Sequence, residues 1–400
     1  MTPRRLAGVL ATIVALGLTP QSGGARVSAT LVAIQYESNA ASLVRVDPVS
    51  LERVDDSAIS LDRDTGGFTF SPEGTEVAFG SNGTTMLHLY DLVRMKARPS
   101  FEVARGPGSV WVIAWPKADR LLAFVQSCCS KSAVLTIDPE AGRVLARSPL
   151  HGEVRDAEPT PDGAALLVAP ANAIGPARLA LVDADGAVRR VTVARVQVGF
   201  KPKPSIARAR QVVPGLAVDG VGRRIFLVQA HGPTAEIGLQ DLSVSYHAIR
   251  ASTRRLAAAQ KEFRGPWRSA SYLGGGMLAV SGFDGVRSGD SFSFVPAGLM
   301  VIDTRDWTVR TIDKVSTGFT FAPPLLLVLN YGRFVAYSVQ GQKRFQIDVD
   351  QPLGYSTTVG SHAYVWLKDN SIAVIDLDSA AIVNTTAPKS LLPIALAPPN

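Results

Sequence analysis

Three observations predict an all-β fold for this sequence of 400 residues. An apolar, alternating strand that ends in aspartate recurs about every 45 residues, and each copy is flanked by turns rich in Gly, Asn, Asp and Pro. No helical pattern of comparable length interrupts the series; the stretch 252–263 is the one short helix candidate. Four short antiparallel strands per unit are typical of a β-propeller blade. We predict a single β-propeller of seven or eight four-stranded blades, with eight favoured.

The marker strand sets the blade count. It occurs as LVRVD at 43–47, LHLYD at 87–91, LTID at 135–138, LALVD at 179–183, IGLQD at 237–241, LMVID at 299–303 and IAVID at 372–376. The last interval has room for two units, and VAYSVQ at 335–340 fits there as a copy without its aspartate. That copy makes eight; without it, seven blades is the alternative.

The two ends of the chain predict how the ring closes. The first unit, 30–55, has no inner strand, whereas LLPIALAP at 391–398 is an apolar strand without a unit of its own. Pairing the C-terminal strand into the first blade would remove both exposed edges. Residues 30–400 are therefore predicted to form one propeller domain.

Residues 1–29 are typical of a signal peptide. Arg4 and Arg5 precede an apolar stretch at 6–18 and a polar exit, with cleavage expected after Ala25 or Ala29. The stretch is too short to cross about 30 Å of hydrocarbon comfortably. We expect a secreted or periplasmic protein without a membrane span; an uncleaved N-terminal anchor is the alternative.

Composition narrows the class of protein. With 46% hydrophobic and 19% charged residues, the chain is neither wholly disordered nor a disulfide-stapled miniprotein. Its formal charge of +7 is mildly basic, and part of it leaves with the leader. No nucleic-acid-binding motif occurs, and an exported chain is a poor match for such a partner.

Several stretches resemble a known group of proteins. SPEGTEVAF at 71–79, TPDGAALLV at 160–168, VID at 301–303 and DPEAGRV at 138–144 resemble secreted bacterial β-propeller repeat proteins of the TolB-like, YVTN and quinoprotein amine dehydrogenase β-chain-like kinds. The resemblance covers nearly all of the mature chain and implies blades, not an activity. The tryptophan-docking repeats of quinoprotein alcohol dehydrogenases and the paired GH and WD motifs of WD40 proteins are missing.

Long connections are predicted to gather on one face. If the strands of a blade are named a to d from the channel outward, the b-to-c and d-to-a connections emerge together. The insertions fall in these two classes, at 196–211, 251–269 and 283–297, with smaller ones at 171–176 and 230–235. We call this side the long-loop face and expect binding there.

The same face is predicted to be basic. The cations are Lys201, Lys203, Arg208 and Arg210 in one insertion, and Arg250, Arg254, Arg255, Lys261, Arg264 and Arg268 in or beside the next. Such a cluster would recognise a phosphate- or carboxylate-bearing envelope polymer or an acidic protein surface. The alternative is a set of solvated loops in an arginine-rich chain.

Other residues with reactive side chains give weaker signals. Cys128 and Cys129 are adjacent in a b-to-c loop and would form a vicinal disulfide in an oxidising compartment; two reduced thiols are the alternative. His151 and His231 also fall in long-loop connections, but no metal-ligand spacing accompanies them, so no metal or cofactor is predicted. DGVRSGD at 284–290 lacks EF-hand spacing and is expected to be a flexible turn.

The sequence therefore favours an exported, non-catalytic β-propeller that binds a protein or an anionic envelope ligand through its long-loop face. No catalytic residue is predicted, and the oligomeric state is left open. The competing hypothesis is a propeller enzyme, a quinoprotein-like oxidoreductase or a lyase-like protein, with its site at the channel mouth on the same face. Such an enzyme would need converging His, Asp, Glu or Arg groups there, or a metal.

Overall fold

The computed structural model describes residues 30–37, 40–62, 65–127, 131–201, 210–249, 251, 263–288, 291–387 and 390–398. Within these ranges every regular element is a β-strand. No helix in the same ranges is long and apolar enough to cross a bilayer. The expected signal peptide and the helix candidate at 252–262 lie outside the described residues, and residue 263 begins a strand instead.

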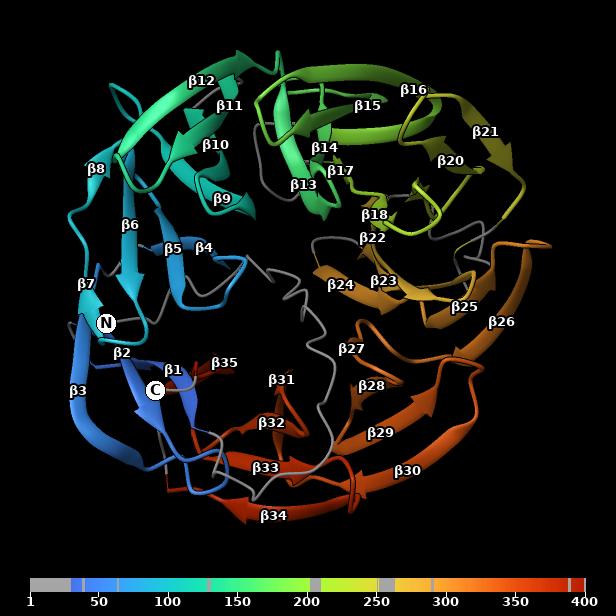
Figure 1. The fold of residues 1–400 in the computed structure, drawn as a ribbon. Coiled ribbons are helices and arrows are strands. Elements are labelled where there is room, and N and C mark those ends of the chain that lie inside the picture. The colour runs from blue at the N-terminus through green and yellow to red at the C-terminus, as the bar shows by residue number, and fades with distance from the viewer. Residues whose placement is uncertain are drawn as a thin grey trace.

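Eight antiparallel sheets stand around a ring (Figure 1). In each blade the strands are named from the centre of the ring outward. Blade 1 consists of β35 (Leu391–Leu396), β1 (Leu31–Tyr36), β2 (Ala41–Val46) and β3 (Arg53–Leu61). Blade 2 consists of β4 (Thr65–Phe70), β5 (Glu76–Ser81), β6 (Met86–Asp91) and β7 (Lys96–Ala97), with β8 (Phe101–Glu102) also on β6. Blade 3 consists of β9 (Ser109–Lys117), β10 (Arg120–Ser127), β11 (Lys131–Asp138) and β12 (Arg143–Pro149). Blade 4 consists of β13 (Glu153–Thr160), β14 (Gly163–Ala169), β15 (Ile174–Asp183) and β16 (Val188–Lys201), extended by β17 (Arg210–Val212).

The second half of the ring repeats this order. Blade 5 consists of β18 (Gly215–Asp219), β19 (Arg224–Val228), β20 (Thr234–Gly238) and β21 (Val244–His247). Blade 6 consists of β22 (Phe263–Gly274), β23 (Met277–Ser288), β25 (Leu299–Asp303) and β26 (Thr308–Asp313), with β24 (Ser291–Pro296) on the far end of β23. Blade 7 consists of β27 (Thr320–Ala322), β28 (Leu325–Asn330), β29 (Arg333–Ser338) and β30 (Lys343–Asp348). Blade 8 consists of β31 (Pro352–Val359), β32 (His362–Leu367), β33 (Ile372–Asp376) and β34 (Ala381–Thr385). The prediction of eight blades is confirmed, and the seven-blade alternative is wrong.

The ring closes as predicted. β35 pairs antiparallel with β1, with Gln35 opposite Leu391 and Leu31 opposite Leu396. The indole Nε1 of Trp366 in blade 8 donates to the carbonyl of Leu391 at 3.1 Å, so the closing strand is also tied to its other neighbour. The C-terminal strand thus gives blade 1 its inner strand and covers an edge that would otherwise be exposed.

The marker aspartates shape the turn between strands c and d. The Oδ1 atom of Asp47 accepts the backbone N–H groups of Val49 and Ser50 at 2.9 and 2.7 Å. In blade 7 the hydroxyl of Ser338 takes this place and accepts the N–H of Gln342 at 3.2 Å. These bonds satisfy turn amides that no strand partner reaches.

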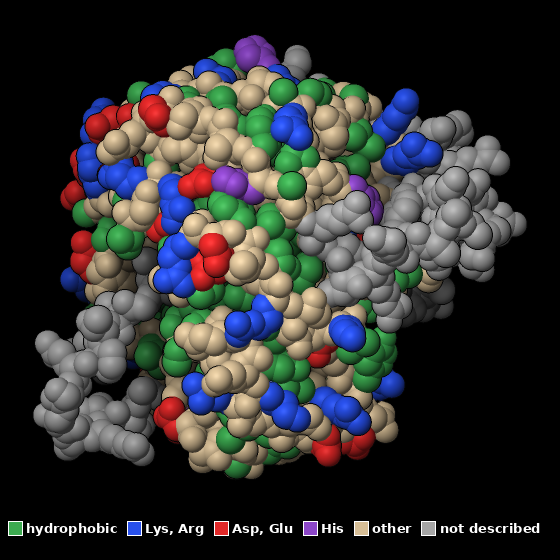
Figure 2. All heavy atoms as spheres, turned by 90° about the vertical axis from the view of Figure 1, so that its right-hand side faces the viewer, with side chains coloured by type: hydrophobic (Ala, Val, Ile, Leu, Met, Phe, Trp, Pro, Cys, Tyr) green, Lys and Arg blue, Asp and Glu red, His purple; other side chains and the backbone are tan. Residues whose placement is uncertain are grey.

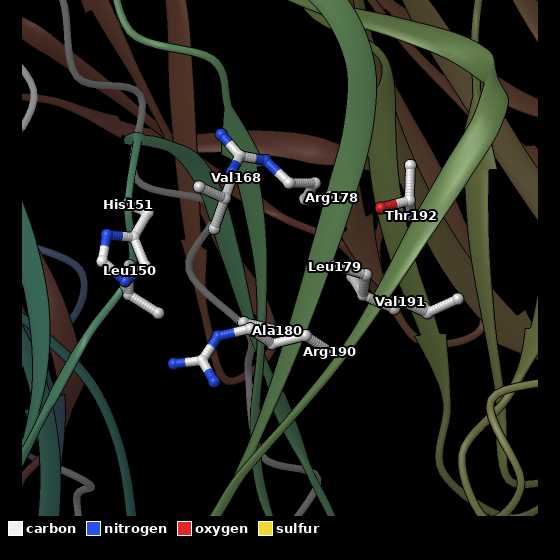
Figure 3. Close-up of a pocket in the computed structure, with 9 residues that line it drawn as sticks. All are labelled: Leu150, His151, Val168, Arg178, Leu179, Ala180, Arg190, Val191 and Thr192. Atoms are coloured by element: carbon white, nitrogen blue, oxygen red, sulfur yellow. The ribbon is translucent and has the colours of Figure 1, made fainter.

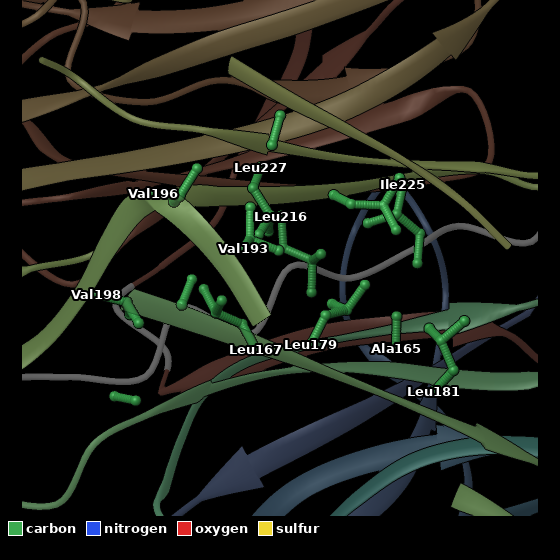
Figure 4. Packing of buried hydrophobic residues seen from close by; sticks show 14 of the residues in the cluster. Ala165, Leu167, Leu179, Leu181, Val193, Val196, Val198, Leu216, Ile225 and Leu227 are labelled. Atoms are coloured by element: carbon green, nitrogen blue, oxygen red, sulfur yellow. The ribbon is translucent and has the colours of Figure 1, made fainter. Parts of the chain in front are cut away.

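The core lies between neighbouring blades. Between blades 4 and 5, Leu167 and Leu179 pack with Leu216, Ile225 and Leu227, all fully buried or nearly so (Figure 4). Each such side chain contributes on the order of 1.5–3 kcal/mol by leaving water. The outer flank around β21 and β26 shows basic and acidic side chains interspersed with apolar ones (Figure 2).

Candidate functional site

The long-loop face is built partly from strands that extend beyond the blades. The far end of β16 pairs with the start of β15, from Pro176 opposite Gln197 to Ile174 opposite Gly199. In blade 6, β22 and β23 stay paired as far as Phe263 and Val286, and β24 folds back along β23. The expectation that 196–211, 251–269 and 283–297 are loops is therefore wrong for 196–201, 210–211, 263–269, 283–288 and 291–296, which are strands. The smaller insertions expected at 171–176 and 230–235 likewise end in strands, at 174–176 and 234–235. The turns on the opposite face, such as 118–119 and 275–276, are short.

The two large insertions lie against one another. The N–H of Val213 donates to the carbonyl of Pro266 at 3.0 Å, and the N–H of Arg268 donates to the carbonyl of Val213 at 2.8 Å. At Gly265, which has φ of 133°, an added Cβ would lie 1.3 Å from the carbonyl oxygen of Gln211. Only glycine permits this approach. The backbone before blade 5 is thus joined directly to the inner strand of blade 6.

Two of the predicted binding cations are placed by this arrangement. Lys201 and Arg210 face each other across β16 and β17, and both are exposed. Like charges directly opposite on a pair of strands repel, so this edge is electrostatically suited to an anion. Of the other predicted cations, Lys203, Arg208, Arg250, Arg254, Arg255 and Lys261 lie outside the described residues, as do Cys128 and Cys129. Arg264 belongs to strand β22.

Arg268 is not part of the basic surface, contrary to the sequence-based expectation. It is 1% exposed, and its Nη2 lies 3.0 Å from Oδ1 of the equally buried Asp284. Its Nε donates to the carbonyl of Ala251 at 2.6 Å. Asp284 belongs to β23 rather than to a flexible turn, and Asp290 lies outside the described residues. The pattern DGVRSGD predicted a turn because an aspartate is rare inside a buried strand. In the structure Asp284 is tolerated there because Arg268, on the neighbouring strand β22, pairs with it.

The feature that sequence reasoning missed is aromatic. Among the described side chains, the exposed aromatic residues all stand on the long-loop face: Tyr36, Trp267, Phe294, Tyr331 and Tyr355. Tyr36 ends strand b of blade 1. Phe294 and Tyr331 lie in the connections from strand b to strand c of blades 6 and 7, and Trp267 and Tyr355 lie in the first half of strand a of blades 6 and 8. The signal in the sequence was their position beside turn residues at strand ends, as for Tyr331 before Gly332.

Three of the aromatic rings in blade 6 form a continuous cluster. Trp267 stacks on Phe283 with ring centroids 5.9 Å apart, and Phe283 meets Phe294 edge-on at 4.7 Å. Trp267 is 42% exposed and Phe294 60% exposed, so the cluster presents rigid apolar surface to solvent. Stacked and edge-on aromatic pairs gain electrostatic energy from their ring quadrupoles in addition to the energy of burial.

A pair of carboxyl groups lies on the inner strand of blade 4. Asp156 accepts backbone N–H groups from Ala157 and from Leu216 of blade 5, while Glu158 is buried. Burial raises the pKa of Asp156 to about 6. Burial, together with the negative charge of Asp156, raises the pKa of Glu158 well above its usual value. Such a pair can retain a proton near neutral pH.

The histidines on the long-loop face are surface groups. His151, with φ of 38°, is exposed in the connection between blades 3 and 4, and His231 is exposed in blade 5. Across the described ranges, no three His, Cys, Asp or Glu side chains are grouped as metal ligands. The nearby Glu153 instead forms an ion pair with Arg155 and accepts a hydrogen bond from the N–H of Asn172.

The chain resembles proteins of known structure in its fold. No protein-family model matches the sequence, and no curated protein matches it. The chain superimposes on the dihydro-heme d1 dehydrogenase NirN in complex with DHE with a TM-score of 0.59, at 14% identity over 97% of this chain and 78% of that one. The chain has a β-propeller fold. A second similar β-propeller is apo AztD from Citrobacter koseri, with a TM-score of 0.55 and 12% identity over 90% of this chain and 96% of that one. At these identities the likeness establishes the fold of this β-propeller and not its activity.

Proposed function

We propose that this chain is an extracytoplasmic, non-catalytic β-propeller that binds a protein or an anionic envelope ligand through its long-loop face. The observation that carries the proposal is the gathering of the exposed aromatic side chains on that face. Tyr and Trp dominate the energetic centres of protein interfaces because they bury much area at little entropic cost. The basic edge at Lys201 and Arg210 supports an acidic partner.

The proposed location rests on the sequence. The positive residues, apolar stretch and small-residue exit within 1–29 are those of an export signal. Growth of the host with a C-terminally tagged chain, followed by fractionation and N-terminal sequencing, tests this. A mature N-terminus at residue 26 or 30 in an extracytoplasmic fraction supports export, whereas full-length protein in the cytoplasm contradicts it.

The binding face is tested by site-specific photo-crosslinking in the native host. A crosslinker replaces Tyr331, which is 84% exposed on the long-loop face, or Val221, which is 98% exposed on the opposite face. We expect one defined adduct from position 331 and none from position 221. Equal adducts from both positions would contradict a face-specific partner.

The crosslinked partner then allows a quantitative test. With the purified partner, the double change Trp267→Ser and Phe294→Ser should weaken binding at least about tenfold, because hot-spot aromatics contribute about 2 kcal/mol or more. Val221→Ser is the matched control and should bind as the wild type does. Unchanged affinity of the double variant would remove the aromatic cluster from the interface.

A propeller enzyme with its site in the channel is the second candidate. The observation in its favour is the Asp156 and Glu158 pair, because a carboxyl that keeps its proton near neutral pH can serve as a general acid. Purification of the mature protein from its host, with absorption spectroscopy and metal analysis, separates the candidates. A stoichiometric chromophore or metal would overturn the non-catalytic proposal.

A further inference from the structure

The geometry points to a second, separate binding site: a cleft between blades 3 and 4 that takes a small ligand carrying one phosphate or carboxylate group. The cleft has a volume of about 190 Å³. One wall is the connection from β12 to β13, and the other is made of β14, β15 and β16. It involves neither the aromatic residues nor the Lys201 and Arg210 edge of the long-loop face.

Three basic groups converge on this cleft. Figure 3 shows the guanidiniums of Arg178 and Arg190 on the strand side, one above the other, with the His151 imidazole across the gap. Arg190 is held in place by donating to the carbonyl of Pro149 at 2.7 Å. Among the described residues, no carboxylate lines the cleft. Guanidinium groups in such a setting bind phosphate or carboxylate through paired N–H donors.

Arg178 differs from every comparable arginine in the described part of the chain. The other arginines there that are buried or half-buried each lie within ion-pair distance of a carboxylate: Arg45, Arg98, Arg120, Arg155, Arg224 and Arg268. Arg178 is half-buried, and no hydrogen bond or ion pair joins it to another described residue. Its N–H donors are therefore open to a ligand oxyanion, which would supply the acceptors.

The remaining lining restricts the ligand. Leu150, Val168 and Val191 give the cleft an aliphatic lining, so the group bound by the arginines can carry a short apolar body. The volume is below the range of about 300–1,000 Å³ typical of sites for drug-sized molecules. The site therefore fits a small organic acid or a small phosphomonoester, and excludes a nucleotide or a folded partner.

Titration of the mature protein with inorganic phosphate and, separately, with butyrate, by isothermal calorimetry at low ionic strength, tests the proposal. We expect saturable binding of one equivalent in at least one arm, and the arm that binds identifies the oxyanion. Arg178→Gln should weaken that binding at least about tenfold, because charge-assisted bonds are lost. Arg333→Gln, which removes one exposed arginine on blade 7, is the charge-matched control and should bind as the wild type does.

The same variants give a readout that does not depend on the ligand. Because Arg178 has no acceptor in the free protein, Arg178→Gln should leave the melting temperature without ligand unchanged or raised. As a second check, phosphate or butyrate should raise the melting temperature of the wild type but not that of Arg178→Gln. Failure of both anions to bind the wild type, or equal binding by Arg178→Gln, would overturn the proposal. Arg190→Gln repeats the test from the second guanidinium. None of these outcomes bears on the exposed aromatic residues or on the Lys201 and Arg210 edge, so the two proposals fail independently.

Discussion

Arg268 and Asp284 form an ion pair inside the wall of blade 6, with 3.0 Å between Nη2 of the arginine and Oδ1 of the aspartate. Both residues are at most 2% exposed. The Nη1 atom of the same guanidinium donates to the carbonyls of Trp267 and Phe283 at 2.9 and 3.0 Å. The pair thus fixes the base of the strand extension that carries the exposed aromatic cluster.

Breaking this pair should be strongly destabilising. Asp284→Ala leaves the Arg268 charge buried without its counter-ion, so we expect the free energy of unfolding to fall by about 3–5 kcal/mol. Asp185→Ala is the control: that carboxylate is 71% exposed and lies 3.6 Å from Arg120, and its loss should cost less than about 1 kcal/mol. Denaturant unfolding measures both. Similar losses would mean that the buried pair is not a structural requirement.

The turn aspartates predict a loss of stability in acid. The N–H of Ser50 is the largest cause that lowers the pKa of Asp47 below its usual value. A lowered folded-state pKa contributes stability above about pH 4 that is lost as the pH falls through the folded value. Asp47→Asn keeps an acceptor oxygen but does not titrate, so its unfolding free energy should fall less than that of the wild type between pH 5 and 2. Parallel curves for the two proteins would contradict this.

The fold could be predicted because it repeats. A single hairpin signal is weak, but eight copies of one apolar strand, each closing in a turn with defined hydrogen bonds, point to the same blade. One copy was misaligned: in blade 5, Gly238 stands at the start of the turn, and Asp241 comes later and accepts the N–H of Ser243 at 3.0 Å. An aspartate can accept turn N–H groups from the first position of such a turn or from a later one, so the spacing of aspartates alone does not show which position each one occupies.

The candidate site was predicted less well, because its key groups meet only through tertiary contacts. Arg268 looked like a loop cation, since nothing local shows that Asp284 lies beside it on the next strand. Tyr331 and Tyr355 lie far from Trp267 in sequence and share a face only when the ring is closed. The side of the ring was predictable from strand alternation, whereas the burial of a particular side chain was not.

The carboxyl pair in blade 4 should reduce stability at high pH. Because burial raises the pKa of Asp156 to about 6 and that of Glu158 well above its usual value, the folded chain binds more protons than the unfolded chain. The stability is then fully present below about pH 4 and is lost as the pH rises through the folded values. Glu158→Gln should raise the unfolding free energy at pH 8 by about 1–3 kcal/mol and change it little at pH 4. Glu140→Gln, on an exposed turn, should be neutral at both values; an equal gain there would contradict the assignment.

The closing strand offers a test of the ring itself. Ile394 is 3% exposed and packs with Ile34 and Leu43, whereas Leu396 on the same strand is 45% exposed. Ile394→Ala should lower the free energy of unfolding by about 2–4 kcal/mol, because it removes buried methyl groups and leaves a cavity. Leu396→Ala should cost less than about 1 kcal/mol. Denaturant unfolding with intrinsic tryptophan fluorescence reports directly on this join, because Trp366 donates to Leu391 in β35. If the two variants unfold alike, β35 does not hold blade 1 closed in solution, and the edge of β1 is free to pair with another chain.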